Sequence, residues 1–340
     1  MTVSAAISPV HYSNGFRYTT APRWFDFYNC RVLIPERRLF FFTMPFILSG
    51  TELPSGMAGL LVYDGGNGGP GPAARCEWER IDGPWSASSE RCDVRWRRGG
   101  EEQEFGEQRI RVTGPTSQWD VTIEPFLADQ QPEETNPRRL EMGERLLLSR
   151  VPFVHRVPRM RAYAAGTIVQ EGRRYTFDRA LVYQAKNHGH AFPDEWIWIH
   201  SGAFREDPAM AIEAGSMRYG DGESAALVRI STALGVRYLM SWNGDDVRVR
   251  RDGNAYEFYA VTRDGGLEIQ GAGVHGDAVA FSFPTPDGGR FDNDECLTGE
   301  LTVSLAGRRL TTNMAALARA WRLPPPAGQR FAERTLGGFP

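Results

Sequence analysis

A single lysine stands among histidines in residues 183–193, YQAKNHGHAFP. The chain has 39 lysine and arginine residues together, and Lys186 is the only lysine among them. His188, His190 and His200, three of the six histidines, lie close by in the sequence. Arginine cannot replace lysine where a confined site needs a compact donor or a change of protonation. Lys186 therefore marks this segment as a candidate site, against the simpler alternative of a chance survivor of arginine codon bias.

The three histidines could bind a metal ion, because imidazole is a common metal ligand. No acidic or sulfur ligand follows them at a recognised spacing, and no H-E-x-x-H pattern is present. We therefore favour histidines that form hydrogen bonds in a cavity or lie at its mouth. A metal-dependent enzyme stays open as a lesser alternative that elemental analysis would test.

Two other motifs bear on ligand binding. The stretch YDGGNGGPGP, residues 63–72, fits a dinucleotide glycine pattern, but prolines and an expected strand follow where that motif needs a helix. It is therefore predicted to be a hairpin loop. In WIWIH, residues 196–200, strand alternation puts Trp196, Trp198 and His200 on one face. That face is either a structural aromatic ladder or the lining of a cavity.

Composition excludes several classes of protein. The net charge of −3 comes from scattered charges without a basic patch, which argues against a nucleic-acid partner. No apolar run is long enough to span a membrane, and the first residues do not resemble a secretory signal. The four cysteines, which form no C-x-x-C pair, fit packed thiols of a reduced protein. We expect a cytoplasmic protein that binds a hydrophobic small molecule, with its oligomeric state unknown.

Short aromatic and β-branched runs, separated by glycine and proline, predict a mainly β protein. We expect two antiparallel β domains of barrel or sandwich type, residues 1–160 and 161–340. A polar segment at 128–145 is the best candidate for a linker. The prolines of residues 150–161 predict an irregular connection. Thr312 as N-cap, followed by NMAALARAW, predicts a short helix near the C-terminus. The predicted strands are 27–35, 38–48, 57–64, 75–82, 92–98, 108–113, 119–125, 162–170, 173–187, 196–204, 225–233, 236–242, 246–251, 255–262, 267–270, 278–283 and 299–305.

Residues 177–198, FDRALVYQAKNHGHAFPDEWIW, resemble the signature of the tocopherol cyclase family. That signature reads Phe-Asp-x-Ala-Leu-Val-Tyr, then Glu-Lys-Asn-Trp-Gly, then Phe-Pro-x-x-Trp-x-Trp. Weaker resemblance covers residues 23–35, RWFDFYNCRVLIP, and 295–305, ECLTGELTVSL. The resemblance implies lipocalin-like β barrels with a ligand site in or between them. It also implies ring closure without a cofactor, in a wider group similar to carotenoid hydratases and lipocalin-like pericyclases.

The chain departs from this signature where the chemistry is expected. Ala185 replaces the family's glutamate and cannot deliver a proton, and His188 replaces a tryptophan. His200 stands where the family has glutamine, and Gly202 where it has a nearby asparagine. The histidines are new titratable groups, weak acids for an alkene but adequate for protons on phenols, enols or carbonyls.

On this resemblance, Lys186 would hold or polarise a substrate oxygen, and His188 and His200 would act as acid or base. Asn187 would orient the substrate, and Trp196 and Trp198 would shape the cavity. Asp178 is a further candidate for catalysis. The remaining candidates for substrate binding are His190, Tyr183, Trp24 and Asp26.

The favoured function is a cofactor-independent cyclase, an isomerase that acts on a prenylated or polyene natural product. Loss of the glutamate favours a pericyclic closure or a heteroatom addition over a reaction that starts with a strong acid. Two alternatives remain, a lipid or terpenoid carrier that has lost catalysis, and a hydratase of an isoprenoid alkene.

Overall fold

The computed structural model describes residues 23–48, 57–64, 75–80, 85–89, 91–114, 117–125, 148, 152–222, 225–275 and 278–323. The strands up to the middle of the chain are β1 (Phe25–Ile34), β2 (Leu39–Leu48), β3 (Met57–Asp64), β4 (Arg75–Arg80), β5 (Trp85–Ala87), β6 (Asp93–Arg98), β7 (Glu101–Gly106), β8 (Arg109–Thr113), β9 (Ser117–Ile123), β10 (Phe153–Gln170) and β11 (Arg173–Gly189). The later strands are β12 (Glu195–Ser201), β13 (Ala211–Arg218), β14 (Ala225–Thr232), β15 (Gly235–Met240), β16 (Asp246–Asp252), β17 (Ala255–Val261), β18 (Glu268–Val274), β19 (Ala278–Pro284), β20 (Arg290–Leu305) and β21 (Arg308–Leu323). Short 3-10 segments are η1 (Pro35–Arg37) and η3 (Ser241–Asn243).

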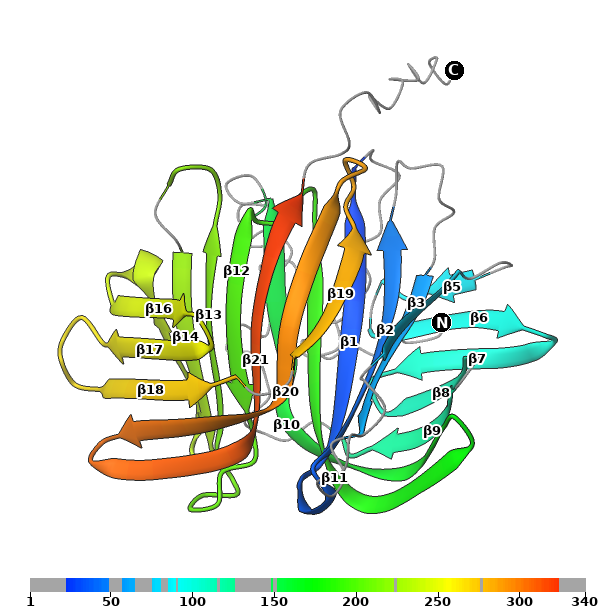
Figure 1. Ribbon diagram of the computed structural model, residues 1–340, viewed down its shortest axis with the longest axis horizontal. Coiled ribbons are helices and arrows are strands. Elements are labelled where there is room, and N and C mark those ends of the chain that lie inside the picture. The colour runs from blue at the N-terminus through cyan, green and yellow to red at the C-terminus, as the bar shows by residue number, and fades with distance from the viewer. Residues whose placement is uncertain are drawn as a thin grey trace, which may run out of the picture.

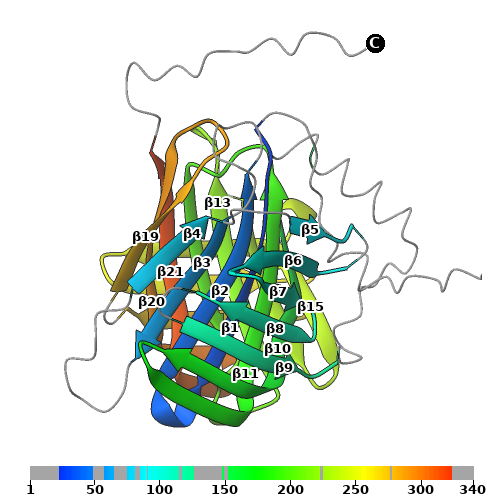
Figure 2. The same cartoon turned by 90° about the vertical axis from the view of Figure 1, so that its right-hand side faces the viewer.

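The strands form two antiparallel sheets that curl and stand side by side (Figure 1). The first sheet has the order β4-β3-β2-β1-β11-β10-β9-β8-β7-β6-β5. The second has the order β15-β14-β13-β12-β21-β20-β18-β17-β16, and β19 pairs with β20 beside this path. Figure 2 shows the strands of the first sheet crossing the view obliquely as the sheet curves. The prediction of two lipocalin-like antiparallel β units is confirmed.

Two long hairpins, β10–β11 and β20–β21, form the middle of the two sheets. β11 pairs with β1 and β10, and β21 pairs with β12 and β20. The chain passes from the first sheet to the second after Gly189, which has φ of 156°. A Cβ atom there would lie 2.0 Å from the Pro152 carbonyl oxygen, so this close approach of two backbones requires glycine. Whether residues 1–160 and 161–340 are separate domains stays a prediction.

Strand alternation divides the apolar residues into four clusters, because successive side chains point to opposite faces. The smallest comprises Tyr183, Ala185, Trp198, Ala316 and Ala318. One cluster fills the concave side of the first sheet and includes Tyr28, Cys30 and Val32. A second fills the concave side of the second sheet, with Ile199 and Leu317 among its members. A third lies between the sheets and is rich in phenylalanine: Phe25, Phe27, Phe40, Phe42, Phe46, Phe153, Phe192, Phe281, Phe283 and Phe291.

The predicted helix near the C-terminus is wrong, because residues 312–321 lie within strand β21. β21 is hydrogen-bonded on both sides, to β20 and to β12. The alanines that give this segment its helical propensity alternate between its two faces, with Ala315 in the second sheet's cluster and Ala318 facing the first sheet. Small side chains let the two sheets approach closely, and this tertiary packing overrides propensity.

The irregular connection predicted for residues 150–161 is also wrong from Phe153 onwards, where β10 begins. Pro158 falls between Arg156 and Arg159, at a shift in the pairing register of β10 with β11. A proline without a backbone donor is tolerated where the ladder is already interrupted. The glycine stretch at 65–72 and the linker predicted at 128–145 lie outside the described residues.

The other predicted strands agree with the structure to within a few residues, although the last one is far longer than expected. The 3-10 segment η1 makes a tight connection between β1 and β2. Strands β5, β7 and β13 were not predicted. No helix among the described residues has the length and apolar character needed to cross a membrane.

Candidate functional site

Strand β11 sends the residues of the predicted site to two different faces. Tyr183, Ala185 and Asn187 face the second sheet, whereas Lys186 and His188 face the concave side of the first. The alternation follows from the two-residue repeat of a strand. The contiguous segment that contains the lone lysine therefore contributes to two separate environments.

A pocket lies between the sheets, with about 540 Å³ of space free of protein atoms, a figure that includes open solvent. It is lined by Phe27, Asn29, Arg31, Phe42, Met44, His155, Tyr183, Asn187, Phe192, Trp196, Trp198, Phe281, Phe283, Phe291, Asn293, Glu295, Ala318 and Ala320. Phe192 stacks on Phe291 with ring centroids 4.7 Å apart, and on Phe25 at 4.3 Å. Aromatic rings thus form most of one wall, as expected for a site that takes an apolar molecule.

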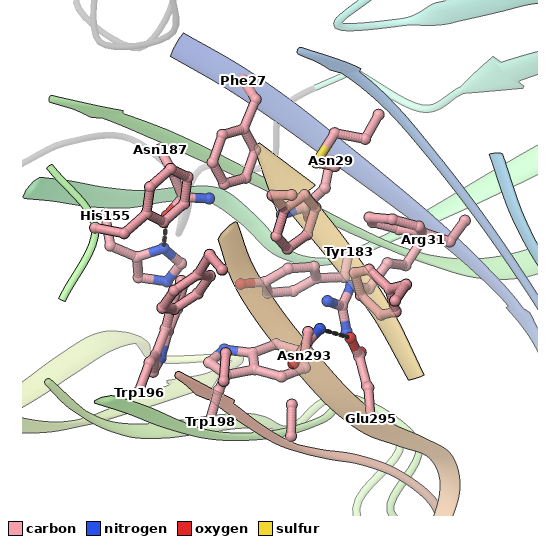
Figure 3. Close-up of a pocket in the computed structure, with 18 residues that line it drawn as sticks. Phe27, Asn29, Arg31, His155, Tyr183, Asn187, Trp196, Trp198, Asn293 and Glu295 are labelled. Atoms are coloured by element: carbon pink, nitrogen blue, oxygen red, sulfur yellow. Dashed lines mark hydrogen bonds and ion pairs between the residues drawn. The ribbon is translucent and has the colours of Figure 1, made fainter. Parts of the chain in front are cut away.

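Asn187 enters the pocket between Phe27 of β1 and His155 of β10, its partners on the neighbouring strands. The His155 Nδ1 atom lies 2.7 Å from Asn187 Oδ1 (Figure 3). The His155 Nε2 atom lies 2.7 Å from Glu213 Oε1. A carboxylate accepts hydrogen bonds, so Nε2 donates to Glu213. The Asn187 Nδ2 atom has no hydrogen-bond partner among the described residues.

Glu213 of β13 is fully buried and anchors this side of the pocket. Its Oε1 accepts from Tyr183 Oη at 2.9 Å and from Trp198 Nε1 at 2.8 Å, and its Oε2 accepts from Arg229 Nη1 at 2.7 Å. Burial alone would raise the pKa of Glu213, but Arg229 and His155 outweigh burial and hold the pKa well below its ordinary value. Glu213 is therefore an ionised acceptor and not a proton donor.

A second charged group, Arg31 with Glu295, lies across the pocket from Asn187. The Arg31 Nη1 atom forms an ion pair with Glu295 Oε1, and Asn293 Nδ2 donates to Glu295 Oε2 at 3.1 Å (Figure 3). The guanidinium carbon of Arg31 lies 4.1 Å from the ring centroid of Trp198. Burial raises the pKa of Glu295, and the charge of Arg31 limits that rise.

Lys186 lies on the opposite face of β11 and does not line the pocket. Its Nζ is 3.4 Å from Asp26 Oδ2 and 5.5 Å from the ring centroid of Tyr28, and both charged side chains are fully buried. His188 is also fully buried on this face, opposite Asp26 in the pairing of β1 with β11. Trp24 packs against His188 with centroids 5.8 Å apart.

The remaining predicted residues are spread over three places. His190 is exposed, with its ring 4.9 Å from that of Trp24, and Asp178 is exposed on the outer part of β11. His200 is buried beyond Trp198, with its ring 4.2 Å from that of Tyr183. Its Nε2 donates to the Met160 carbonyl oxygen at 3.0 Å, and burial lowers its pKa to about 4. Tyr183, Asn187, Trp196 and Trp198 are the predicted residues that line the pocket.

His188, His190 and His200 do not come together. Among the described residues, no group of three or more histidine, cysteine, aspartate or glutamate side chains is arranged to hold a metal ion. The described cysteines Cys30, Cys92 and Cys296 are buried free thiols.

Four charged or polar residues of the pocket region were missed from the sequence: Arg31, His155, Glu213 and Glu295. Each is a titratable or charged residue within or beside an apolar run, and a lone charge in a buried strand is a usable signal. Arg31 interrupts FYNCRVLIP, and Glu213 stands in MAIEA. Glu213 was not a candidate because strand β13 was not predicted. His155 was not a candidate because its segment was expected to be irregular.

Comparison with solved structures supports the fold. The crystal structure of CghA superposes with a TM-score of 0.59, with 11% identity and 89% of each chain covered. Two other structures give lower TM-scores. A putative AttH from Nitrosomonas europaea has a TM-score of 0.49 and 12% identity, with 89% of this chain and 94% of that chain covered. Kievitone hydratase from Nectria haematococca has a TM-score of 0.48 and 8% identity, with 88% of this chain and 89% of that chain covered. These likenesses concern the fold alone. No curated protein sequence matches the chain.

The sequence itself carries a family assignment. The model of the tocopherol cyclase-like family matches residues 102–322, which is well over half of the chain and includes the whole of β11 and β12. This match agrees with the resemblance read from residues 177–198, and it supports an enzyme. The chain belongs to the tocopherol cyclase-like family.

Proposed function

We propose that the protein is a cofactor-independent cyclase, a ring-forming isomerase that folds a hydrophobic polyene or prenylated substrate in the pocket between its two sheets. The observation that carries this proposal is the pocket itself, which combines an aromatic wall with polar side chains such as Arg31, Asn187 and Glu295. Its polar groups are held by networks around Glu213 and Glu295. A flexible apolar chain bound there would lose most of its alternative conformations.

The pocket can promote ring closure mainly through positioning. Holding the two reacting ends of one molecule together removes most of the entropic barrier to their reaction. The phenylalanine wall excludes water, and the faces of Trp196 and Trp198 can stabilise positive charge that develops on the substrate. These contributions need neither a cofactor nor a strong acid.

The acid–base groups near the pocket favour a closure that is not started by a strong acid. Glu213 is ionised, His200 has committed its Nε2 hydrogen to Met160, and Ala185 carries no proton. We therefore favour a pericyclic closure or the addition of an oxygen or nitrogen to an activated acceptor. Arg31 and Asn187 would serve as the hydrogen-bond donors that activate it.

One observation favours a second candidate function. Glu295 lines the pocket, and its raised pKa makes it the best-placed proton donor among the described pocket residues. An alkene protonated by Glu295 could be captured by water, which would make the protein a hydratase. The ion pair with Arg31 opposes this role, because it stabilises the charged carboxylate.

The proposal also gives new roles to the predicted residues. Asn187, Tyr183, Trp196 and Trp198 shape and orient the substrate, whereas Lys186, Asp26 and His188 support β1 and β11 from behind. The exposed Asp178 has no part in the reaction in this proposal.

The experiment is to incubate the purified protein with an extract of the source organism and to follow each retained compound by liquid chromatography and mass spectrometry. A product of identical mass and changed retention supports the cyclase. A gain of one water indicates the hydratase, and release of an unchanged compound indicates a carrier. Protein with Trp196→Ala and Trp198→Ala, which opens the aromatic wall, serves as the matched control and should convert little or nothing.

A further inference from the structure

Glu213 lies behind the pocket and holds three of the side chains that line it. Its Oε1 atom accepts hydrogen bonds from His155 Nε2 at 2.7 Å, Trp198 Nε1 at 2.8 Å and Tyr183 Oη at 2.9 Å. All three donors belong to residues of the pocket lining, whereas Glu213 is fully buried outside that lining. One carboxylate oxygen therefore fixes three side chains of the pocket wall.

The four residues come from both sheets. His155 and Tyr183 stand on β10 and β11 of the first sheet, and Trp198 and Glu213 stand on β12 and β13 of the second. Figure 3 shows the three donors around the pocket. Because the hydrogen bonds of His155 and Tyr183 cross from one sheet to the other, they fix the two halves of the pocket wall relative to each other.

This arrangement needs a carboxylate. Arg229, which pairs with Glu213 across β13 and β14, donates to Oε2 at 2.7 Å and leaves Oε1 for the other donors. An ionised carboxylate accepts hydrogen bonds on both oxygens and donates none. A glutamine would turn its amide nitrogen either toward Arg229 or toward the three donors, and each orientation brings donors face to face. Glu213→Gln therefore disrupts the arrangement with almost no change in side-chain size.

We propose that Glu213 is a positioning residue for ring closure, which acts through His155, Tyr183 and Trp198 without touching the substrate. A displacement of about 1 Å in a positioning group can slow a reaction about a hundredfold, because the substrate is no longer held in its reactive shape. The phenylalanine side of the pocket does not depend on Glu213 and should still bind an apolar molecule. This inference rests on the proposed function for the reaction that Glu213 serves.

The same geometry fixes the position of a hydrogen on His155. Because the ionised Glu213 can only accept, the Nε2 atom of His155 carries a hydrogen. Nδ1 is then the ring nitrogen at which His155 gains or loses a proton. Glu213 thus determines the tautomer of a pocket histidine as well as the orientation of its ring.

The test compares two variants that change a buried, ion-paired carboxylate into an amide. Glu213→Gln alters the group behind the pocket, and Asp26→Asn alters the partner of Lys186 on the other face of β11. Both are assayed with the compound converted in the extract experiment, at a temperature at which unfolding curves show folded protein. Glu213→Gln should lower kcat at least about thirtyfold with KM within about threefold, and Asp26→Asn should keep kcat within about threefold. Equal losses of kcat in the two variants, or a raised KM with unchanged kcat in Glu213→Gln, would overturn the proposal.

A second measurement separates this inference from the proposed function, because it needs no turnover. Hydrogen exchange of the Trp198 indole N–H, followed by NMR, should be at least about tenfold faster in Glu213→Gln and should change less than about threefold in Asp26→Asn. This result without any isomerised compound would remove the cyclase and keep Glu213 as the group that orders the pocket. An unchanged exchange rate in Glu213→Gln would overturn the positioning role even if the protein is a cyclase.

A third measurement uses the unmodified protein and so does not depend on the folding of a variant. Nitrogen-15 NMR of the histidine rings should find a hydrogen on the Nε2 atom of His155. A hydrogen on Nδ1 alone would show that His155 does not donate to Glu213, and this would overturn the proposal.

Discussion

The two faces of β11 differ in what their buried polar groups do. On the pocket face, Asn187 forms a hydrogen bond with His155, and its Nδ2 atom has no partner among the described residues. On the other face, Lys186 is enclosed inside the first sheet and forms an ion pair with Asp26. The side chains are adjacent in sequence and equally buried, yet one is suited to binding and the other to support.

The difference shows how a single strand can serve binding and stability at once. A motif that is contiguous in the sequence need not form one site, because alternate residues of a strand face opposite sides. A lysine that is unique in composition is therefore not necessarily the residue that meets the substrate. The predictions below test this division, beginning with the largest expected effect.

Removal of Lys186 should lower the stability of the protein, which is the largest change in stability that we expect. Lys186→Met leaves the buried Asp26 carboxylate without its ammonium partner, which should lower the free energy of unfolding by about 3–5 kcal/mol. The double substitution Lys186→Met with Asp26→Leu removes both charges and should recover most of that loss. Urea unfolding of the two variants measures both effects. A single variant as stable as the unmodified protein would show that the ion pair does not support the sheet.

His200 should make the pocket side sensitive to acid. Its pKa is about 4 in the folded protein, compared with about 6.5 in an unfolded chain. Between these values the unfolded chain binds a proton that the folded protein does not, so the free energy of unfolding falls as the pH drops from 6.5 to 4. The loss can reach about 3 kcal/mol.

Replacing this histidine should flatten that slope. His200→Gln keeps a donor for the Met160 carbonyl but cannot titrate, so its stability should change less between pH 7 and pH 4.5. Urea unfolding at the two pH values gives the comparison. Identical pH slopes in variant and unmodified protein would mean that His200 is not buried in its neutral form.

Matched tryptophan substitutions compare the pocket region with the apolar cluster of the first sheet. Trp198 donates to Glu213 in the pocket region, whereas the Nε1 atom of Trp119 in the first sheet's cluster has no hydrogen-bond partner among the described residues. Trp198→Phe and Trp119→Phe lose similar packing, so Trp198→Phe should cost about 1 kcal/mol more through its lost hydrogen bond. Equal losses in the free energy of unfolding, measured by thermal or urea unfolding, would show that this hydrogen bond does not stabilise the protein.

Much of the fold, but only part of the candidate site, can be predicted from the sequence. Alternating runs such as residues 38–48 predict strands because the pleat imposes a period of two. The helix predicted at residues 312–321 is wrong. Alanine and leucine favour a helix, but here pairing with a strand on each side overrides that propensity.

The candidate site shows a similar limit. Tyr183, Asn187, Trp196 and Trp198 could be found from the family motif, and the alternation that separates Lys186 from them was already visible in the predicted strand 173–187. Glu213 and Glu295 could not be assigned to the pocket from local patterns. They reach it through pairings between distant segments, which the order of strands in the second sheet alone determines.

The most direct test of the division between the two faces compares turnover in matched variants. Conversion of the compound found in the extract experiment is measured for Asn187→Leu and for the double variant Lys186→Met with Asp26→Leu, after unfolding curves show that both are folded. Asn187→Leu should lose at least about a hundredfold in turnover, while the double variant should stay within about threefold of the unmodified protein. Full activity in Asn187→Leu with none in the folded double variant would contradict the account and return the chemistry to the lysine face.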